Sequence, residues 1–224
     1  MAIPLFLILV GYAAGVLLPL CFPARPRIQN LIAHGLAAVA TMGGIYLGMV
    51  GLLAPEPLAM SVPSTLPLLT FALRLDALSS LFLLMISFVG LAASIYAVGY
   101  VTELYGRISI GLLGSLYNAF LLSMTLVVLA DNGFFFLIAW ELMSLFSYFL
   151  VVTEHEKSDV RYAGLFYLIM THIGTAFVIL TFLLLFQGSG SFSFDAFRNL
   201  GHPLPDNMRT MAFVLALVGF GTQA

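Results

Sequence analysis

Two ionisable residues, Glu141 and His172, stand inside long apolar stretches of this sequence. Glu141 lies 12 residues before Thr153, and His172 lies 11 residues after Arg161. If both stretches are helices, each residue is about 16–18 Å from the end that faces the short loop between them. A loop of that length makes the two helices antiparallel neighbours. The spacing therefore predicts a carboxylate and an imidazole at one depth.

Such a pair has an obvious chemical use in a membrane. A charged side chain at the bilayer centre costs on the order of 2.5–3.5 kcal/mol, so an acid at that depth suggests function. An imidazole titrates near pH 6.5, and burial raises carboxylates toward that range, so a proton can pass between the two groups. We expect hydroxyl-bearing side chains to support the relay: Ser144, Tyr148, Thr171 and Thr175. The alternative interpretation is a buried hydrogen bond or ion pair that only fixes helix packing.

The composition determines the class of protein. The chain has 224 residues, of which 62% are hydrophobic and 8% are charged, and its mean hydropathy is +1.10. Soluble domains carry roughly 25% charged residues, so this is an integral membrane protein. The net charge of −2 gives no reason to expect a nucleic-acid partner. The single cysteine, Cys21, excludes an internal disulfide.

Six apolar runs are long enough to cross a bilayer, for which about 20 helical residues suffice. They span residues 3–22, 30–53, 77–98, 112–130, 133–153 and 161–186. A seventh run begins near 208 and is cut short at Ala224, so we expect the chain to be an N-terminal fragment. The predicted fold is an all-α integral membrane protein, a polytopic bundle of six complete transmembrane helices plus the start of a seventh. We divide it into helices one and two (1–60), a loop with an extended segment (61–76), and helices three to seven (77–224).

The connecting segments carry their own signals. Residues 65–75 are extended in character, and Asp76 suits the N-cap of the helix that follows. Asp131 and Asn132 are expected to cap the helix over 133–153. The stretch 193–201, with a serine at its start and a glycine at its end, predicts a short helix along the membrane surface.

The positive charges predict the orientation. The loops after the first, third and fifth helices hold five of the eight Lys and Arg residues, and the opposite loops hold three. Because cytoplasmic loops carry the excess of positive charge, we place the first set in the cytoplasm and the N-terminus outside. Arg74 and Arg198 belong to the outer set.

The sequence offers no phosphate-binding loop, dinucleotide fingerprint or metal-ligand spacing. We therefore expect no catalytic residue, cofactor or metal on this chain. The residues themselves predict a membrane protein with a protonatable site, most simply a translocator of protons or cations.

Two blocks add a family resemblance. Residues 140–150, Trp-Glu-Leu-Met-Ser-Leu-Phe-Ser-Tyr-Phe-Leu, together with Thr171-His-Ile-Gly-Thr175, resemble the antiporter-like membrane subunits of the complex I and group 4 nickel–iron hydrogenase superfamily. The likeness is greatest to the hydrogenase-4 and formate hydrogenlyase type, and residues 74–79 and 92–100 extend it. It covers roughly residues 70–224.

The resemblance implies the first half of an inverted-repeat fold with a discontinuous seventh helix. It implies a subunit of a prokaryotic inner membrane complex that moves protons while partner subunits carry out redox chemistry. Nickel–iron and iron–sulfur centres would then lie on a peripheral arm, and other membrane-arm subunits would be neighbours. Glu141 matches the family's fifth-helix glutamate, and His172 matches a position where hydrogenase-type subunits carry histidine.

One residue departs from the family pattern. The family's glutamate is thought to pair with a lysine on the broken seventh helix, and the residue that aligns there is Gln223. Without that lysine, Glu141 lacks the cation that would keep it ionised. A second function therefore stays open, a structural or vestigial membrane anchor of such a complex that moves no protons.

Overall fold

The computed structural model describes residues 2–63, 70–199 and 204–222. Six of its helices are long and apolar enough to cross a membrane. They are α1 (Ala2–Leu17), α2 (Pro26–Leu53), α3 (Ala77–Tyr100), α4 (Ile110–Leu129), α5 (Gly133–Val151) and α6 (Ser158–Ser189). Short 3-10 turns extend α1, α3 and α5, over Leu18–Cys21, Val101–Leu104 and Val152–Glu154. The six predicted transmembrane helices are thus confirmed.

The remaining elements are shorter. Two strands, β1 (Leu58–Pro63) and β2 (Thr70–Leu75), precede α3, while α7 (Phe194–Arg198) and α8 (Asp206–Gly221) follow α6. Helix α8 lies where the start of a seventh transmembrane helix was expected, but it is not among the six helices long and apolar enough to cross a membrane. We call the end of the bundle that carries β1, β2 and α7 the hairpin end, and the end that carries the α5–α6 connection the loop end.

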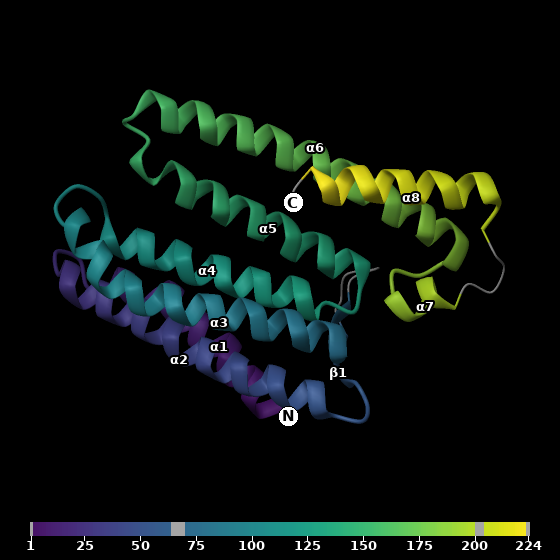
Figure 1. The fold of residues 1–224 in the computed structure, drawn as a ribbon, viewed down its shortest axis with the longest axis horizontal. Helices are drawn as coiled ribbons and strands as arrows, with labels where there is room; N and C mark the ends of the chain where they lie inside the picture. The colour runs from purple at the N-terminus through teal and green to yellow at the C-terminus, as the bar shows by residue number, and fades with distance from the viewer. Residues whose placement is uncertain (1, 64–69, 200–203, 223–224) are drawn as a thin grey trace.

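The helices lie side by side in two groups (Figure 1). Helices α1 to α4 form one bundle, α5 lies against α4, and α6 and α8 follow as the outermost pair. Helices α5 and α6 run antiparallel, as their short connection predicted. Glu141 of α5 and His172 of α6 therefore lie in the second group, which consists of α5, α6 and α8, and the bundle of α1 to α4 supports this group.

Close contact between α2 and α3 depends on glycines. A Cβ atom at Gly44 would overlap the hydroxyl of Ser87, and one at Gly51 would overlap the hydroxyl of Ser80. Small residues let two membrane helices approach closely, which is a main source of attraction where lipid competes for apolar contact. The first bundle is consequently packed tightly.

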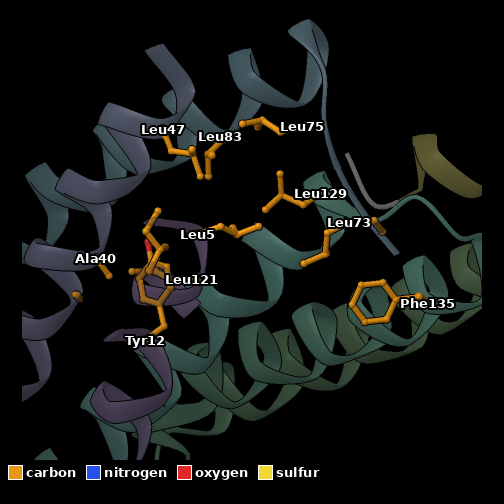
Figure 2. Packing of buried hydrophobic residues seen from close by; sticks show 13 residues of the cluster. Leu5, Tyr12, Ala40, Leu47, Leu73, Leu75, Leu83, Leu121, Leu129 and Phe135 are labelled. Atoms are coloured by element: carbon orange, nitrogen blue, oxygen red, sulfur yellow. The ribbon is translucent and has the colours of Figure 1, made fainter. Parts of the chain in front are cut away.

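The main hydrophobic core lies within this first bundle and reaches the hairpin (Figure 2). Tyr12 of α1, Leu47 of α2 and Leu129 of α4 are almost fully buried in it. Leu73 and Leu75 of β2 close the core at the hairpin end, and Phe135 joins it from α5. This core links the start of α5 to the first bundle.

The structure confirms part of the predicted extended segment. Strand β2 pairs antiparallel with β1, from Leu58 opposite Leu75 to Pro63 opposite Thr70. The prediction missed β1, and residues 65–69 of the predicted segment lie outside the described ranges. Strand β2 also bridges to Ala130 at the end of α4.

The predicted helix caps have different outcomes. Asp76 forms a capping box with Ser79 at the start of α3, as expected. Asn132 caps α5 by accepting hydrogen bonds from Phe134 and Phe135, but Asp131 is not the cap. The short helix near 193 is present as α7 and ends at Arg198, earlier than predicted.

Candidate functional site

Glu141 and His172 face each other across the gap between α5 and α6. Glu141 Oε2 lies 3.7 Å from His172 Nε2. The other ring nitrogen, Nδ1, lies 2.9 Å from the backbone oxygen of Leu168, one turn earlier in α6. This second contact fixes the orientation of the ring, so that Nε2 is the atom turned toward the acid. The pairing that helix length predicted is present.

Helices α5 and α6 are held together on both sides of the pair. Toward the loop end, Gly164 of α6 packs directly against Val152 and the ring of Tyr148. Toward the hairpin end, Phe182 of α6 meets Phe136 of α5 edge to face, with ring centroids 5.6 Å apart. The two contacts bracket Glu141 and His172 and set the distance between them.

Both side chains of the pair are partly exposed at the surface of the described part of the chain. The Glu141 side chain is 38% exposed and that of His172 is 54% exposed. Both residues lie inside candidate membrane spans, where contact of an ionised group with lipid is costly. A face with these two groups needs protein or water against it in the membrane.

A groove of about 420 Å³ starts at Glu141 and runs toward the hairpin end between α5 and α6. Apolar side chains such as Ile138, Leu142, Ile179 and Leu183 line it, and Glu141 is the ionisable member of the lining. The accessible surface of the groove is apolar throughout, so Glu141 contributes its aliphatic carbons to the lining.

The two expected supporting residues on α5, Ser144 and Tyr148, differ in how deeply they are buried. Ser144 is buried, whereas Glu141, one turn earlier, is partly exposed. Tyr148 is half-buried beside Gly164 and Phe149. Their place in a relay stays a prediction.

Thr171 and Thr175 lie on the buried side of α6. Thr171 donates to the backbone oxygen of Leu168, the same oxygen that His172 approaches. Gly219 of α8 packs next to these residues, against Gly174 and Val178. Thr171 and Thr175 therefore lie where α6 is covered, while His172 lies where it is open. Gln223, the aligned position of the family lysine, lies outside the described residues.

A second group of charges, which the sequence did not predict as a group, lies at the hairpin end. Arg74 Nη1 of β2 lies 3.0 and 3.2 Å from the two carboxylate oxygens of Asp195 in α7. The same atom is 3.9 Å from Asp131 Oδ2, just before α5. Asp195 also binds Arg198, at 3.1 Å. The available signal was that Arg74 and Arg198 were both expected at the outer face of the membrane.

Within residues 2–63, 70–199 and 204–222, no group of three or more His, Cys, Asp or Glu side chains is placed to hold a metal ion.

Comparison with known proteins gives two family matches. Residues 130–224 match the family described as NADH:quinone oxidoreductase/Mrp antiporter, TM. Residues 67–107 match the family described as NADH-Ubiquinone oxidoreductase (complex I), chain 5 N-terminus. The two matches include the hairpin-end charges, Glu141 and His172.

Individual relatives agree with these matches. The chain is 36% identical to hydrogenase-4 component B of Escherichia coli over 152 residues, which are 68% of this chain and 22% of the relative. The chain thus spans about a fifth of that protein's length. Among solved structures, the Mrp complex from Dietzia superimposes with a TM-score of 0.79 at 20% identity, over 98% of this chain and 23% of the other. Respiratory complex I from Thermus thermophilus superimposes with a TM-score of 0.77 at 19% identity, over 97% of this chain and 43% of the other.

Proposed function

Because this chain belongs to the antiporter-like family of membrane subunits found in NADH:quinone oxidoreductase, Mrp antiporters and hydrogenase-4, we propose that it moves protons across the membrane. The observation that carries the proposal is the approach of Glu141 Oε2 to His172 Nε2, at 3.7 Å between two transmembrane helices. Glu141 is the central proton carrier, and His172 is the relay that receives the proton from it or returns it.

The geometry suits transfer better than permanent pairing. A separation of 3.7 Å is longer than a direct hydrogen bond, and both side chains are partly exposed. One bridging water or a small rotation of either side chain would complete the connection. A buried structural ion pair, in contrast, needs short and fully satisfied hydrogen bonds to offset its desolvation.

The exposed face of the pair points to neighbours. The solved structures similar to this chain are parts of multi-subunit membrane complexes. We propose that the groove beside Glu141 is covered in such an assembly by other transmembrane helices, so that lipid does not meet the carboxylate. A peripheral hydrogenase or dehydrogenase arm would drive the movement.

The redox chemistry belongs to partner subunits in this proposal. Nickel–iron and iron–sulfur centres on the peripheral arm would supply the driving reaction. This chain would then be a non-catalytic subunit of an oxidoreductase complex in a prokaryotic cell membrane. In this proposal the loop end, which holds five of the eight positive charges, would face the cytoplasm, and the hairpin end would face outside.

The variant Glu141→Gln tests the proposal. Glutamine keeps the size of the side chain but can neither bind nor release the proton. We expect the complete complex, reconstituted in liposomes, to assemble normally and to lose redox-driven proton uptake by about 100-fold or more.

The matched control is Glu154→Gln, in the loop beyond α5. Glu154 pairs with Lys157 at 2.6 Å at the bundle surface, so its loss should leave proton uptake unchanged. Undiminished uptake in Glu141→Gln would contradict the proposal. If Glu141→Gln instead lowered complex stability with normal coupling, the pair would be structural and the anchor function would hold.

A further inference from the structure

The hairpin end contains a three-way junction centred on Asp131. Its backbone N–H donates to the Ala72 oxygen of β2 at 2.9 Å, and its backbone oxygen accepts from the Phe194 N–H at the start of α7. The next residue, Asn132, bridges to Ser193 and caps α5. Asp131 is thus held in place by its backbone, and its side chain is not needed to fix the junction.

The Asp131 side chain shares one cation with another acid. Arg74 Nη1 makes its short contacts to Asp195, and its contact to Asp131 is the long one, at 3.9 Å. The two acids also differ in burial, because the Asp131 side chain is 14% exposed and that of Asp195 is 57% exposed. Asp195, the better-paired acid, is the more exposed one, and Asp131, the less exposed one, is only partly neutralised.

Asp131 lines a cavity of about 460 Å³ that Asp195 does not line. Arg74, Asp76 and Arg198 also contribute to its wall near the hairpin end, and Trp140 and Phe220 line it further into the bundle. Trp140 lies seven residues beyond Gly133, or about 10 Å along α5, and is adjacent in sequence to Glu141. The cavity therefore extends from the charged junction toward the depth of the proton carrier.

Arg74 and Trp140 both line this cavity, and one nitrogen of each, Arg74 Nε and Trp140 Nε1, is buried without a hydrogen-bond partner among the described residues. Buried donors are almost always satisfied by protein or by ordered water. The cavity volume is several times that of a water molecule, so a small shift of either side chain would bring its donor into contact with cavity water. Unpaired donors on two of its lining residues fit a hydrated cavity.

We propose that this cavity is the hairpin-end half of the proton pathway, and that the Asp131 carboxylate is the group that exchanges protons with the aqueous phase there. The inference rests on the proposed function. A proton that arrives through the cavity binds an oxygen of Asp131, and Arg74 then pairs with Asp195 alone. Release of that proton to water restores the carboxylate and its attraction to Arg74, so one proton enters and one leaves.

The charges around Asp131 determine when it holds a proton. Burial raises the pKa of the Asp131 carboxyl, while Arg74 and Arg198 lower it and Asp195 and Asp76 raise it. Removal of Asp195 should therefore move the titration of Asp131 to lower pH, and removal of Arg74 should move it to higher pH. These opposite shifts distinguish a titrating group from a structural one.

The experiment uses the complete complex in lipid nanodiscs and in liposomes. Infrared difference spectra between acidic and neutral pH should contain a protonated-carboxyl band that is lost in Asp131→Asn. The midpoint of that band should fall by about half a pH unit in Asp195→Asn and rise by a similar amount in Arg74→Gln. Proton uptake should fall about tenfold or more in Asp131→Asn and remain near normal in Asp195→Asn.

Asp195→Asn is a matched control, because it also removes an acid beside Arg74 but leaves the cavity lining intact. Asparagine at 131 keeps both backbone bonds of the junction, so assembly on native gels should be normal. An unchanged band and unchanged uptake in Asp131→Asn would overturn the inference. If that occurs while Glu141→Gln abolishes uptake, the proposed function stands and only the pathway through Asp131 fails; normal uptake in Glu141→Gln would reject the proposed function itself.

Discussion

His34 and His172 occupy the same local position in two different parts of the molecule. In α2, His34 Nδ1 lies 3.0 Å from the backbone oxygen of Asn30, and in α6 His172 Nδ1 lies 2.9 Å from that of Leu168. Each ring is thus oriented by the turn before it. Their surroundings differ, because His34 is 3% exposed and lies against the tilted ring of Tyr117, with ring centroids 5.3 Å apart, whereas His172 is open and faces Glu141.

The difference follows from how each region is packed. In the first bundle, glycines bring α2 against α3, and polar side chains such as Asn118 and Ser94 bond to nearby backbone oxygens. A histidine there is a satisfied member of a tight core. Between α5 and α6, contacts at the two ends leave the middle open. A histidine there can change partners, which proton transfer requires.

The largest expected effect separates the two histidines. His172→Gln should lower proton uptake by the complete complex by about 100-fold, because the relay partner of Glu141 can no longer take up a proton. His34→Gln should leave uptake within about twofold of normal, because no acid faces His34 within the described residues. The measurement is dye-detected acidification of liposomes that contain the complex. A similar loss in both variants would remove the distinction between the regions.

A double variant sharpens the same comparison. If Glu141 and His172 act in one transfer step, Glu141→Gln combined with His172→Gln should lose no more activity than Glu141→Gln alone. Full additivity of the two losses would mean that the residues act independently.

The next effect concerns the tight packing of the first bundle. Gly44→Ala should lower the stability of the bundle by about 1–3 kcal/mol, because the new Cβ overlaps the Ser87 hydroxyl. Ser87→Gly should restore part of that loss. Gly35→Ala is the control on the same helix, since a Cβ there has no neighbour within 4 Å. Thermal melting of the purified complex in detergent measures all three, and equal melting of Gly44→Ala and Gly35→Ala would contradict close packing.

The sequence could predict the Glu141–His172 pair because local rules determine it. Helix rise sets the depth of each residue, and a short loop between 154 and 161 makes the helices neighbours. Hydropathy predicted the six spans for the same reason, since each span satisfies its hydrogen bonds within itself.

The junction at Asp131 could not be predicted in that way. Arg74 and Asp195 are separated by 121 residues, and their contact depends on the pairing of β2 with β1 and with Ala130. Nothing local marks β1 as a strand, because Leu58–Pro63 follows a membrane helix and has no regular alternation of polar and apolar residues. The assignment of Asp131 to a helix cap failed because the adjacent Asn132 fills that role and leaves Asp131 free to bond to β2 and α7.

The smallest expected effect tests this junction. Arg74 lies there between Asp76, at the start of α3 in the first bundle, and Asp131, just before α5. Burial by itself would raise the pKa of Asp76 at the start of α3, but hydrogen bonds from Ser79 and the nearby Arg74 and Arg198 hold it below the usual range. Ionised Asp76 therefore stabilises the fold above the usual carboxyl pKa, and this contribution is lost as pH falls through the lowered value.

Asp131 should behave in the opposite way, because its pKa is raised by burial. Its ionised form costs stability above the raised value, and the cost disappears as pH falls through that value toward the usual carboxyl pKa. At neutral pH, Asp76→Asn should therefore lower the melting temperature of the complex by about 1–3 °C, and Asp131→Asn should raise it slightly. Both differences should shrink on acidification, in calorimetric scans at a series of pH values. If both variants changed the melting temperature in the same direction, the two acids would share one environment. The tightly packed first bundle and the open α5–α6 pair would then not differ on the two sides of Arg74.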